Sequence, residues 1–209
     1  MASTRTNTGT KGQETRERIL AAAAARFRQH GYADTSVNQV MRDAGLTHGG
    51  FYAHFASKED LFAQAVRHAT DASGDWLESR LQGLDGDAWV ERWVDIYMSD
   101  SHCEHPEGGC PIPALMPEIA RSGPDAGTAF ASSLARRFDR LCPHLPFERT
   151  EAERRALAAY AQMAGAVMLS RTLGLRESAS LRRDVAHQAK HLLLGRVVLP
   201  DAEDEGGRS

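Results

Sequence analysis

Residues 35–60 read TSVNQVMRDAGLTHGGFYAHFASKED, and this stretch decides the fold of the N-terminal part of the chain. Ser36 stands three residues before Gln39, a capping-box pattern in which the two side chains satisfy free backbone donors at the start of a helix. Gly45 comes after one short helical stretch, and glycine readily takes the left-handed conformation that ends a helix and turns the chain. The pattern predicts a short helix followed by a tight turn.

Two further helices are expected after that turn. Thr47 is a suitable N-cap for the second helix, and Ser57 with Asp60 can cap a third helix that begins near Lys58. Apolar residues recur on one face at helical spacing: Val37, Val40, Met41, Ala44, Phe51 and Phe55. Together these signals predict a helix-turn-helix, a unit that places one small helix in the major groove of DNA.

The outward face of the second helix combines small and polar side chains. Small residues at positions 49, 50 and 53 allow the backbone to approach the groove closely. Tyr52 and His54 can hydrogen-bond phosphate oxygens, and Lys58 adds a cation at the groove edge. The competing interpretation is a three-helix unit whose polar face is merely solvated.

Residues 14–62 resemble the DNA-binding domain of TetR-family transcriptional regulators. Three segments carry the resemblance: ETRERILAAA (14–23), FRQHGY (27–32) and AGLTHGGFYAHFASKEDLF (44–62). It implies DNA contacts at Ser36, Val37, Asn38, Thr47, His48, Gly49, Gly50, Tyr52, His54 and Lys58. Many relatives carry a longer side chain at position 49 or 50, whereas this chain has Gly-Gly. His48 and Asn38 are therefore the better candidates for base contacts.

The composition of the chain predicts an all-α fold with two domains. At 209 residues and 42% hydrophobic content, the chain can form a small head and one larger domain with its own core. Runs of β-branched residues are scarce and strand-like alternation is absent. The net charge of −3 is unevenly distributed, since residues 1–60 carry eight Lys+Arg and six Asp+Glu and the rest carry 17 and 22. We expect a modestly basic head on an acidic body.

Four parts are expected along the chain: a disordered arm (1–13), the helix-turn-helix domain (14–60), a helical ligand-binding and dimerisation domain (61–199) and an acidic tail (200–209). The arm either reaches along a DNA groove or is a solvated tail. Expected helices span residues 14–30, 58–81, 88–99, 114–121, 126–142, 150–173 and 178–197, and residues 100–113 are expected to form a loop.

The resemblance also implies a homodimer, in which the last two helices pair with their copies as a four-helix bundle. The sequence agrees in part, because Ala161, Ala164, Gly165 and Ala166 would let helices approach closely. Packing within one chain explains these small residues equally well. A dimer suits recognition, since two heads spaced by about one DNA turn read a palindrome.

The body is expected to hold a small-molecule effector in a pocket between its helices. Candidate lining residues are Trp89, Trp93, Tyr97, His102, Cys110, Met116, Phe130, Phe138, Met163 and Met168. The aromatic residues and methionines also fit ordinary core positions. An effector that favours one separation of the heads would change DNA affinity through its differential affinity for the two states.

The segment 102–110, HCEHPEGGC, is the second informative stretch. Cys110 precedes Pro111 at the start of an expected helix, where a thiol is more reactive, although a buried structural cysteine fits the same pattern. His102, Cys103, His105 and Cys110 contain ligand types that zinc or copper accept, but without a standard paired spacing. A thiol- or metal-responsive regulator is therefore the alternative function, and no metal site is predicted.

No enzyme signature stands out in the sequence. It contains no Gly-rich phosphate loop, Gly-x-Ser-x-Gly elbow or His-Glu-x-x-His motif, so neither catalysis nor a cofactor is predicted. Residues 1–13 are polar and no apolar run approaches about 18 residues, which predicts a cytoplasmic protein with no membrane partner. The sequence as a whole predicts a homodimeric repressor that binds an operator in double-stranded DNA and is released by a small molecule.

Overall fold

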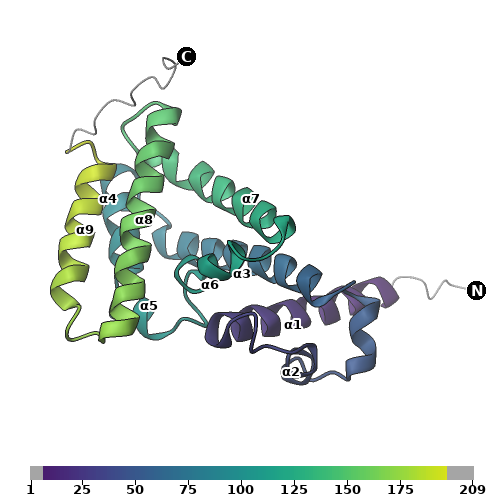
Figure 1. Ribbon diagram of the computed structural model, residues 1–209. Coiled ribbons are helices and arrows are strands. Elements are labelled where there is room, and N and C mark those ends of the chain that lie inside the picture. Colours follow the sequence, from purple (N-terminus) through teal and green to yellow (C-terminus); the bar gives the residue numbers. More distant parts are fainter. Residues whose placement is uncertain (1–6, 197–209) are drawn as a thin grey trace, which may run out of the picture.

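The computed structural model describes residues 7–196, with side chains from residue 11, and every regular element in this range is helical (Figure 1). The elements are α1 (Asn7–His30), α2 (Val37–Asp43), the 3₁₀ helix η1 (His48–Ala53), α3 (Lys58–Leu81), α4 (Gly86–Tyr97), α5 (Asp100–Glu104), α6 (Pro111–Ile119), α7 (Pro124–Leu141), the 3₁₀ helix η2 (Cys142–His144), α8 (Arg149–Leu173) and α9 (Ala179–Leu193). The predicted all-α class is confirmed.

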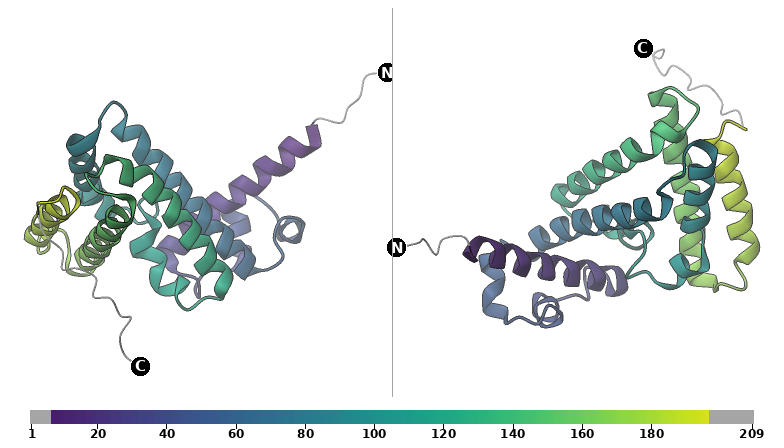
Figure 2. Two further views of the ribbon diagram at one scale, coloured as in Figure 1. Left: turned by 90° about the horizontal axis from the view of Figure 1, so that it is seen from above. Right: turned by 180° about the vertical axis from the view of Figure 1, so that it is seen from behind.

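The head consists of α1, α2, η1 and the first half of α3, and it lies at one end of the molecule (Figures 1 and 2). Its core is apolar and rich in aromatic rings. Phe27 and Phe62 meet edge to face with their centroids 5.0 Å apart, and Tyr32 contacts both rings. Edge-to-face contacts of this kind stabilise a core beyond the area that they bury.

The body consists of the rest of α3 and of α4 to α9. Its own core is a second cluster, in which the stacked Trp89 and Trp93 pack near Tyr160 of α8. Helix α7 packs along α3, and α8 pairs with α9 at the edge of the molecule that lies away from the head (Figure 1).

Helices α3 and α6 join the head to the body. Helix α3 runs unbroken from the head core, where Leu61 and Phe62 are buried, to Leu81 in the body core. Helix α6 packs against α1 and α3, and its Leu115 and Ile119 belong to the head core. The expected domain boundary at residue 60 thus falls inside a continuous packed unit and stays a prediction.

Two boundary predictions are wrong in part. Residues 7–13 were expected in a disordered arm but form the first turns of α1, where the Gln13 side chain donates to Glu17 at 2.9 Å one turn later. The expected loop of residues 100–113 contains α5 and the start of α6. Ser99 caps α5 by accepting from the His102 amide. Residues 1–6 and 197–209, which include the predicted acidic tail, lie outside the described residues.

Candidate DNA-binding face and body cavity

The first helix of the helix-turn-helix begins and ends as the sequence predicts. The Ser36 hydroxyl accepts from the Gln39 amide at 3.3 Å, and the Gln39 side chain accepts from the Ser36 amide at 2.8 Å. Gly45 has a φ of 68°, in the left-handed region. The amides of Gly45 and Leu46 donate back to the carbonyls of Arg42 and Met41, at 2.9 and 2.8 Å. This is a Schellman motif, which satisfies the last carbonyls of α2 and turns the chain.

The second helix differs from the prediction in type and in cap. Residues 48–53 form a 3₁₀ helix, and Thr47 occupies the N-cap position without a side-chain hydrogen bond. The Gly49-Gly50 pair explains the difference, because glycine is the weakest helix former after proline. Phe51 and Phe55 anchor the segment as predicted, since both are buried and stack on each other at 5.7 Å.

The third helix begins with the predicted cap. The Ser57 hydroxyl accepts from the Asp60 amide at 3.1 Å, and the Asp60 carboxylate accepts from the Ala56 amide at 2.9 Å. Lys58, in the first turn of α3, places its Nζ 4.1 Å from the centre of the Tyr32 ring. Tyr32 donates to Glu59 at 2.8 Å. Burial and this bond raise the pKa of the Tyr32 phenol to about 12.

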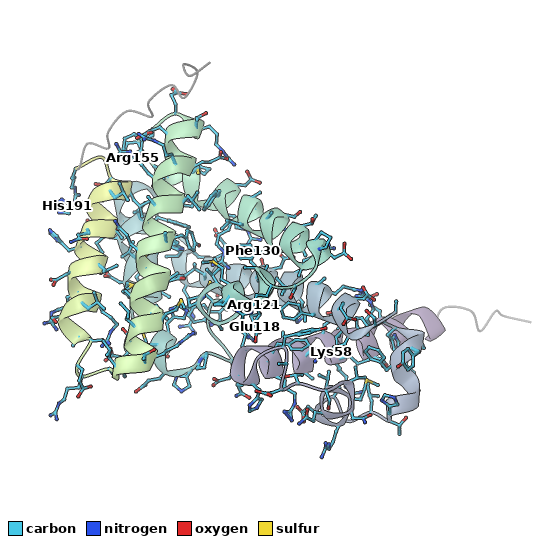
Figure 3. The ribbon with its side chains drawn as sticks, in the orientation of Figure 1. Lys58, Glu118, Arg121, Phe130, Arg155 and His191 are labelled. Carbon is cyan, nitrogen blue, oxygen red and sulfur yellow. The ribbon has the colours of Figure 1, made fainter. Side chains whose placement is uncertain are left out.

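The ten predicted DNA-contact residues lie in three neighbouring segments of the head. Tyr52 is 70% exposed and its ring meets the His48 ring edge to face. The exposed members of the set are Ser36, Asn38, Thr47, His48, Gly49 and Tyr52, and the half-buried members are Val37, Gly50, His54 and Lys58. Figure 3 shows Lys58 in the head, which lies at the opposite end of the molecule from α8 and α9. The assignment of these residues to DNA contacts stays a prediction.

The body contains a cavity of about 410 Å³ between α3, α4, α7 and the segment 99–110. Three of the ten predicted pocket residues line it: Tyr97, His102 and Cys110. Trp89, Trp93, Phe138 and Met163 instead pack in the body core, and the half-buried Phe130 packs against both cores. Met116 and Met168 are exposed to 41% and 39%, on the outer faces of α6 and α8, because helical spacing alone does not identify which face turns inward.

The loop beside this cavity is closed by His102. Its Nδ1 pairs with the Tyr97 carbonyl, and its Nε2 accepts from the Cys110 amide at 3.0 Å. Burial lowers the pKa of the imidazole to about 4, so the ring is neutral near pH 7. Gly109 is required beneath the ring, since a Cβ at this position would lie 2.6 Å from His102 Cδ2.

The alternative function predicted for this loop finds no support. Both ring nitrogens of His102 are engaged with the backbone, which leaves none for a metal. The described residues contain no group of three or more His, Cys, Asp or Glu side chains that is arranged to hold a metal ion. Cys103 and Cys110 are both buried, and burial raises the pKa of the Cys103 thiol.

Most residues that line the cavity were not predicted from the sequence, and two of them are central to its chemistry. Arg137 of α7 is buried and lines the cavity, and Trp76 of α3 lies at its rim with 51% of its surface exposed. One signal was present in the sequence, since Arg137 stands between Leu134 and Leu141 on an otherwise apolar face of its helix. Its helical spacing places Arg137 on the inner face of α7, although arginine is rarely buried without a partner.

Two hydrogen bonds, one at each end of α6, connect the head to the body. The Arg28 side chain of α1 donates to the carbonyl of Gly109 at 2.9 Å, and Gly109 itself lines the cavity. At the other end of α6, Glu118 accepts from the Tyr32 amide at 2.8 Å. Figure 3 shows Glu118 and Arg121 at the junction. They line a second cavity there, of about 340 Å³.

Comparison with known proteins decides the family. Residues 19–65 match the sequence pattern of "Bacterial regulatory proteins, tetR family". A TetR transcriptional regulator from Chloroflexus aurantiacus, solved by crystallography, shares 30% identity and a TM-score of 0.71 over 88% of this chain and 96% of that chain. The chain belongs to the TetR family. As a TetR-family protein it is a DNA-binding transcriptional regulator, and the predicted resemblance is confirmed.

Curated relatives of this TetR-family protein match mainly its head. The uncharacterized HTH-type transcriptional regulator YdgC of Bacillus subtilis is 43% identical over 27% of this chain and 29% of its own length. The HTH-type transcriptional repressor AcnR of Corynebacterium efficiens is 30% identical over 45% of this chain and 53% of its own length. The chain thus matches about half or less of these relatives. Among the described residues, no helix has the length and apolar character needed to cross a bilayer.

Proposed function

We propose that the protein is a homodimeric repressor that binds a palindromic operator through its heads and leaves the operator when a small molecule occupies the body cavity. The observation that carries this proposal is the connection between cavity and head. Gly109 lines the cavity and accepts a hydrogen bond from Arg28 of the head at 2.9 Å. Repression rather than activation is supported by the relative AcnR, which is named a transcriptional repressor.

DNA recognition relies on phosphate contacts and on a few side chains. Tyr52 and Thr47 are exposed and carry hydroxyl groups suited to phosphate oxygens, and Lys58 adds a cation. Gly49 has open space around it, which suits close approach of the backbone to the groove. His48 and Asn38 are the exposed side chains with polar groups for base edges.

The dimer forms through the outer face of α8 together with α9. Leu157, Leu169 and Leu173 are 54%, 50% and 55% exposed, and with Ala161 they follow helical spacing along one face. Large exposed apolar side chains on one helix mark a candidate interaction surface. Of the four small residues predicted to allow close helix approach, Ala164 and Ala166 pack inward, whereas Ala161 is exposed and Gly165 has open space.

Coupling runs from the cavity through α6. A ligand in the cavity contacts the segment 105–110, which leads directly into α6, and α6 ends near Glu118 and its bond to the head. A displacement of α6 thus moves the head relative to α8 and α9. In a dimer this movement changes the separation of the two heads. A ligand that binds more tightly when this separation does not match the operator lowers the affinity for DNA.

DNA binding is tested with fragments selected by the purified protein from a random DNA library. Tyr52→Ala and Lys58→Ala should weaken binding, and Lys58→Ala should also reduce the salt dependence by about one unit of slope. Arg140→Ala removes the same charge from an exposed site on the body and is the control. Unchanged affinity and slope in Lys58→Ala would contradict the assigned face.

Dimerisation is tested by analytical ultracentrifugation. Leu169→Glu places a charge in the exposed leucine face and should yield monomers with greatly weakened operator binding. Leu84→Glu changes another exposed leucine, which lies between α3 and α4, and is the control. A dimer that survives Leu169→Glu would place the interface elsewhere.

A further inference from the structure

The body buries an arginine that no acidic side chain neutralises. The three buried arginines of the described residues are Arg137, Arg155 and Arg182. Arg155 pairs with Glu151, and Arg182 pairs with Asp100. Arg137, at 7% exposure, has no carboxylate partner among the residues that the structure describes. An uncompensated buried charge is costly, so its retention calls for a counter-charge.

Helix α7 provides an internal comparison. Arg136 and Arg140 flank Arg137, are exposed, and pair with Asp71 and Asp75 of α3 at 2.7 and 2.8 Å. Arg137 turns inward instead, where its Nη2 donates to the Thr70 carbonyl at 3.0 Å. Asp71 and Asp75 thus form ion pairs with the two exposed arginines, and neither pairs with Arg137.

The remaining contacts of Arg137 are weak ones. Its Nη1 donates to the Tyr160 hydroxyl at 3.3 Å and lies 3.7 Å from the sulfur of Cys110, and a thiol sulfur is a poor acceptor. Burial by itself lowers the pKa of Arg137, but the Tyr160 and Cys110 side chains more than offset burial, so the pKa stays above its ordinary value. The guanidinium is therefore charged and has donor capacity to spare.

Tyr97, which also lines the cavity, carries a polar group without a hydrogen-bond partner. The Tyr97 hydroxyl is fully buried and finds no hydrogen-bond partner among the described residues, although the Cys110 thiol is close to it. Burial raises the pKa of Tyr97 well above its usual value, so the hydroxyl keeps its proton and can donate it to an acceptor. Tyr97 and Arg137 both line the 410 Å³ cavity.

Besides polar residues such as Ser73, Ser99 and Ser101, the lining includes an apolar wall and further arginines. Leu77, Ile96 and Trp76 provide the apolar wall. Arg80 also lines the cavity, and its guanidinium carbon lies 4.9 Å from the centre of the Trp76 ring. Asp95, the acidic lining residue, pairs with Lys190 at 2.6 Å. The volume falls in the range of small-molecule sites and suits a ligand with an apolar body.

We propose that the cavity binds an apolar organic acid, whose carboxylate accepts hydrogen bonds from Arg137 and from the Tyr97 hydroxyl while its hydrocarbon part packs on Leu77, Ile96 and Trp76. This inference rests on the proposed function only in that it names the chemical class of the effector. A carboxylate matches the site because it offers two oxygens to one guanidinium and one hydroxyl. It also supplies the charge that Arg137 lacks.

The test measures binding to the full-length protein in the absence of DNA. The probes are phenylacetate and the straight-chain carboxylates from butanoate to decanoate, each compared with its primary amide, which has nearly the same shape and no charge. Isothermal titration calorimetry should show that at least one acid binds about tenfold to hundredfold more tightly than its amide. Equal affinities, or failure of every acid to bind at millimolar concentration, would overturn the proposal.

Two variants and one control test whether Arg137 and the Tyr97 hydroxyl bind the acid. Arg137→Gln should remove the preference for acid over amide. Tyr97→Phe should lower the affinity for the acid by about fivefold to tenfold. It should leave the fold intact, because the Tyr97 hydroxyl has no hydrogen-bond partner in the protein to lose. Arg136→Gln, the neighbouring paired arginine, is the control and should bind as the wild type does. Full acid preference in both Arg137→Gln and Tyr97→Phe would refute the assigned site.

A separate measurement distinguishes this proposal from the proposed function. Release of selected DNA is measured with the acid that binds best. Binding without release would leave the acid site standing and count against ligand-released repression. Release by neutral molecules only, with no acid bound, would support the repressor and overturn the acid site.

Discussion

The head and the body bury different kinds of side chain. Among the described residues up to 60, Thr35 is the buried polar side chain, and the core around Phe27, Phe51 and Phe55 is otherwise apolar. The body buries three arginines together with Ser133, Ser170 and Ser178. The apolar core of the head is suited to support a DNA-contacting surface rigidly. The interior of the body contains polar groups whose hydrogen bonds can be exchanged for bonds to a ligand.

The largest effect is expected in the head core. Phe51→Ala should lower the free energy of unfolding by about 3–5 kcal/mol, because the 1% exposed ring would leave a cavity in a tightly packed cluster. Urea denaturation followed by circular dichroism measures the change. Tyr52→Ala, one residue away and exposed, is the matched control and should change stability by less than about 0.5 kcal/mol. Similar losses in both variants would mean that the head core is not the rigid support described above.

Acid should act on the body through His102. Its pKa is about 4 in the folded protein, below the usual value near 6.5, so the unfolded chain binds the proton first. Stability is therefore full above about pH 6.5 and falls as the pH drops toward 4, by up to about 3 kcal/mol.

Thermal unfolding across this pH range measures the effect of His102. His102→Gln should flatten the dependence, whereas His105→Gln, which changes an exposed histidine of the same loop, should retain it. If the stability of His102→Gln fell with pH as steeply as that of the wild type, other groups would cause the acid sensitivity. The buried polar groups of the body would then not include a titrating His102.

The turn of the head should be sensitive to a single methyl group. Gly45→Ala should cost about 1–2 kcal/mol, since its φ of 68° is unfavourable for any residue with a Cβ. Gly49→Ala is the matched control, because Gly49 lies in a 3₁₀ helix with open space around it, and it should be neutral or slightly stabilising. Differential scanning calorimetry separates the two, and equal stability of both variants would contradict the Schellman geometry.

The smallest effect separates a helix cap from a predicted DNA contact. Ser36→Ala should cost about 1 kcal/mol because its hydroxyl caps α2. Thr47→Ala should change stability by less than about 0.5 kcal/mol, since Thr47 makes no capping bond, yet it should weaken DNA binding. Chemical denaturation and DNA titration of both variants give the comparison. A clear loss of stability in Thr47→Ala would mean that its hydroxyl supports the turn after all.

Features that depend on residues close together in the sequence were predicted best. The Ser36 cap, the Gly45 turn and the Ser57 cap each join residues at most five positions apart, and all three are confirmed. The 3₁₀ character of residues 48–53 was not predicted, because two weak helix formers such as Gly49 and Gly50 do not by themselves indicate which type of helix forms.

In the body, seven of the ten predicted pocket residues do not line the cavity. Periodicity identifies an apolar face, but it does not say whether that face meets a core, a cavity or a second subunit. Met168 shows this limit, since it lies on the outer face of α8, where the leucines of the proposed dimer interface are exposed.

By itself the sequence determined the helical class, the order of the long helices and the three-helix head, because caps, turns and apolar periodicity act between residues a few positions apart. Only the tertiary structure decided which polar groups share the body cavity. Arg137 meets Cys110 across 27 residues and Thr70 across 67, and such contacts depend on how helices pack rather than on any local pattern. The same packing pairs Arg136 with Asp71 while it leaves Arg137 inside without a carboxylate.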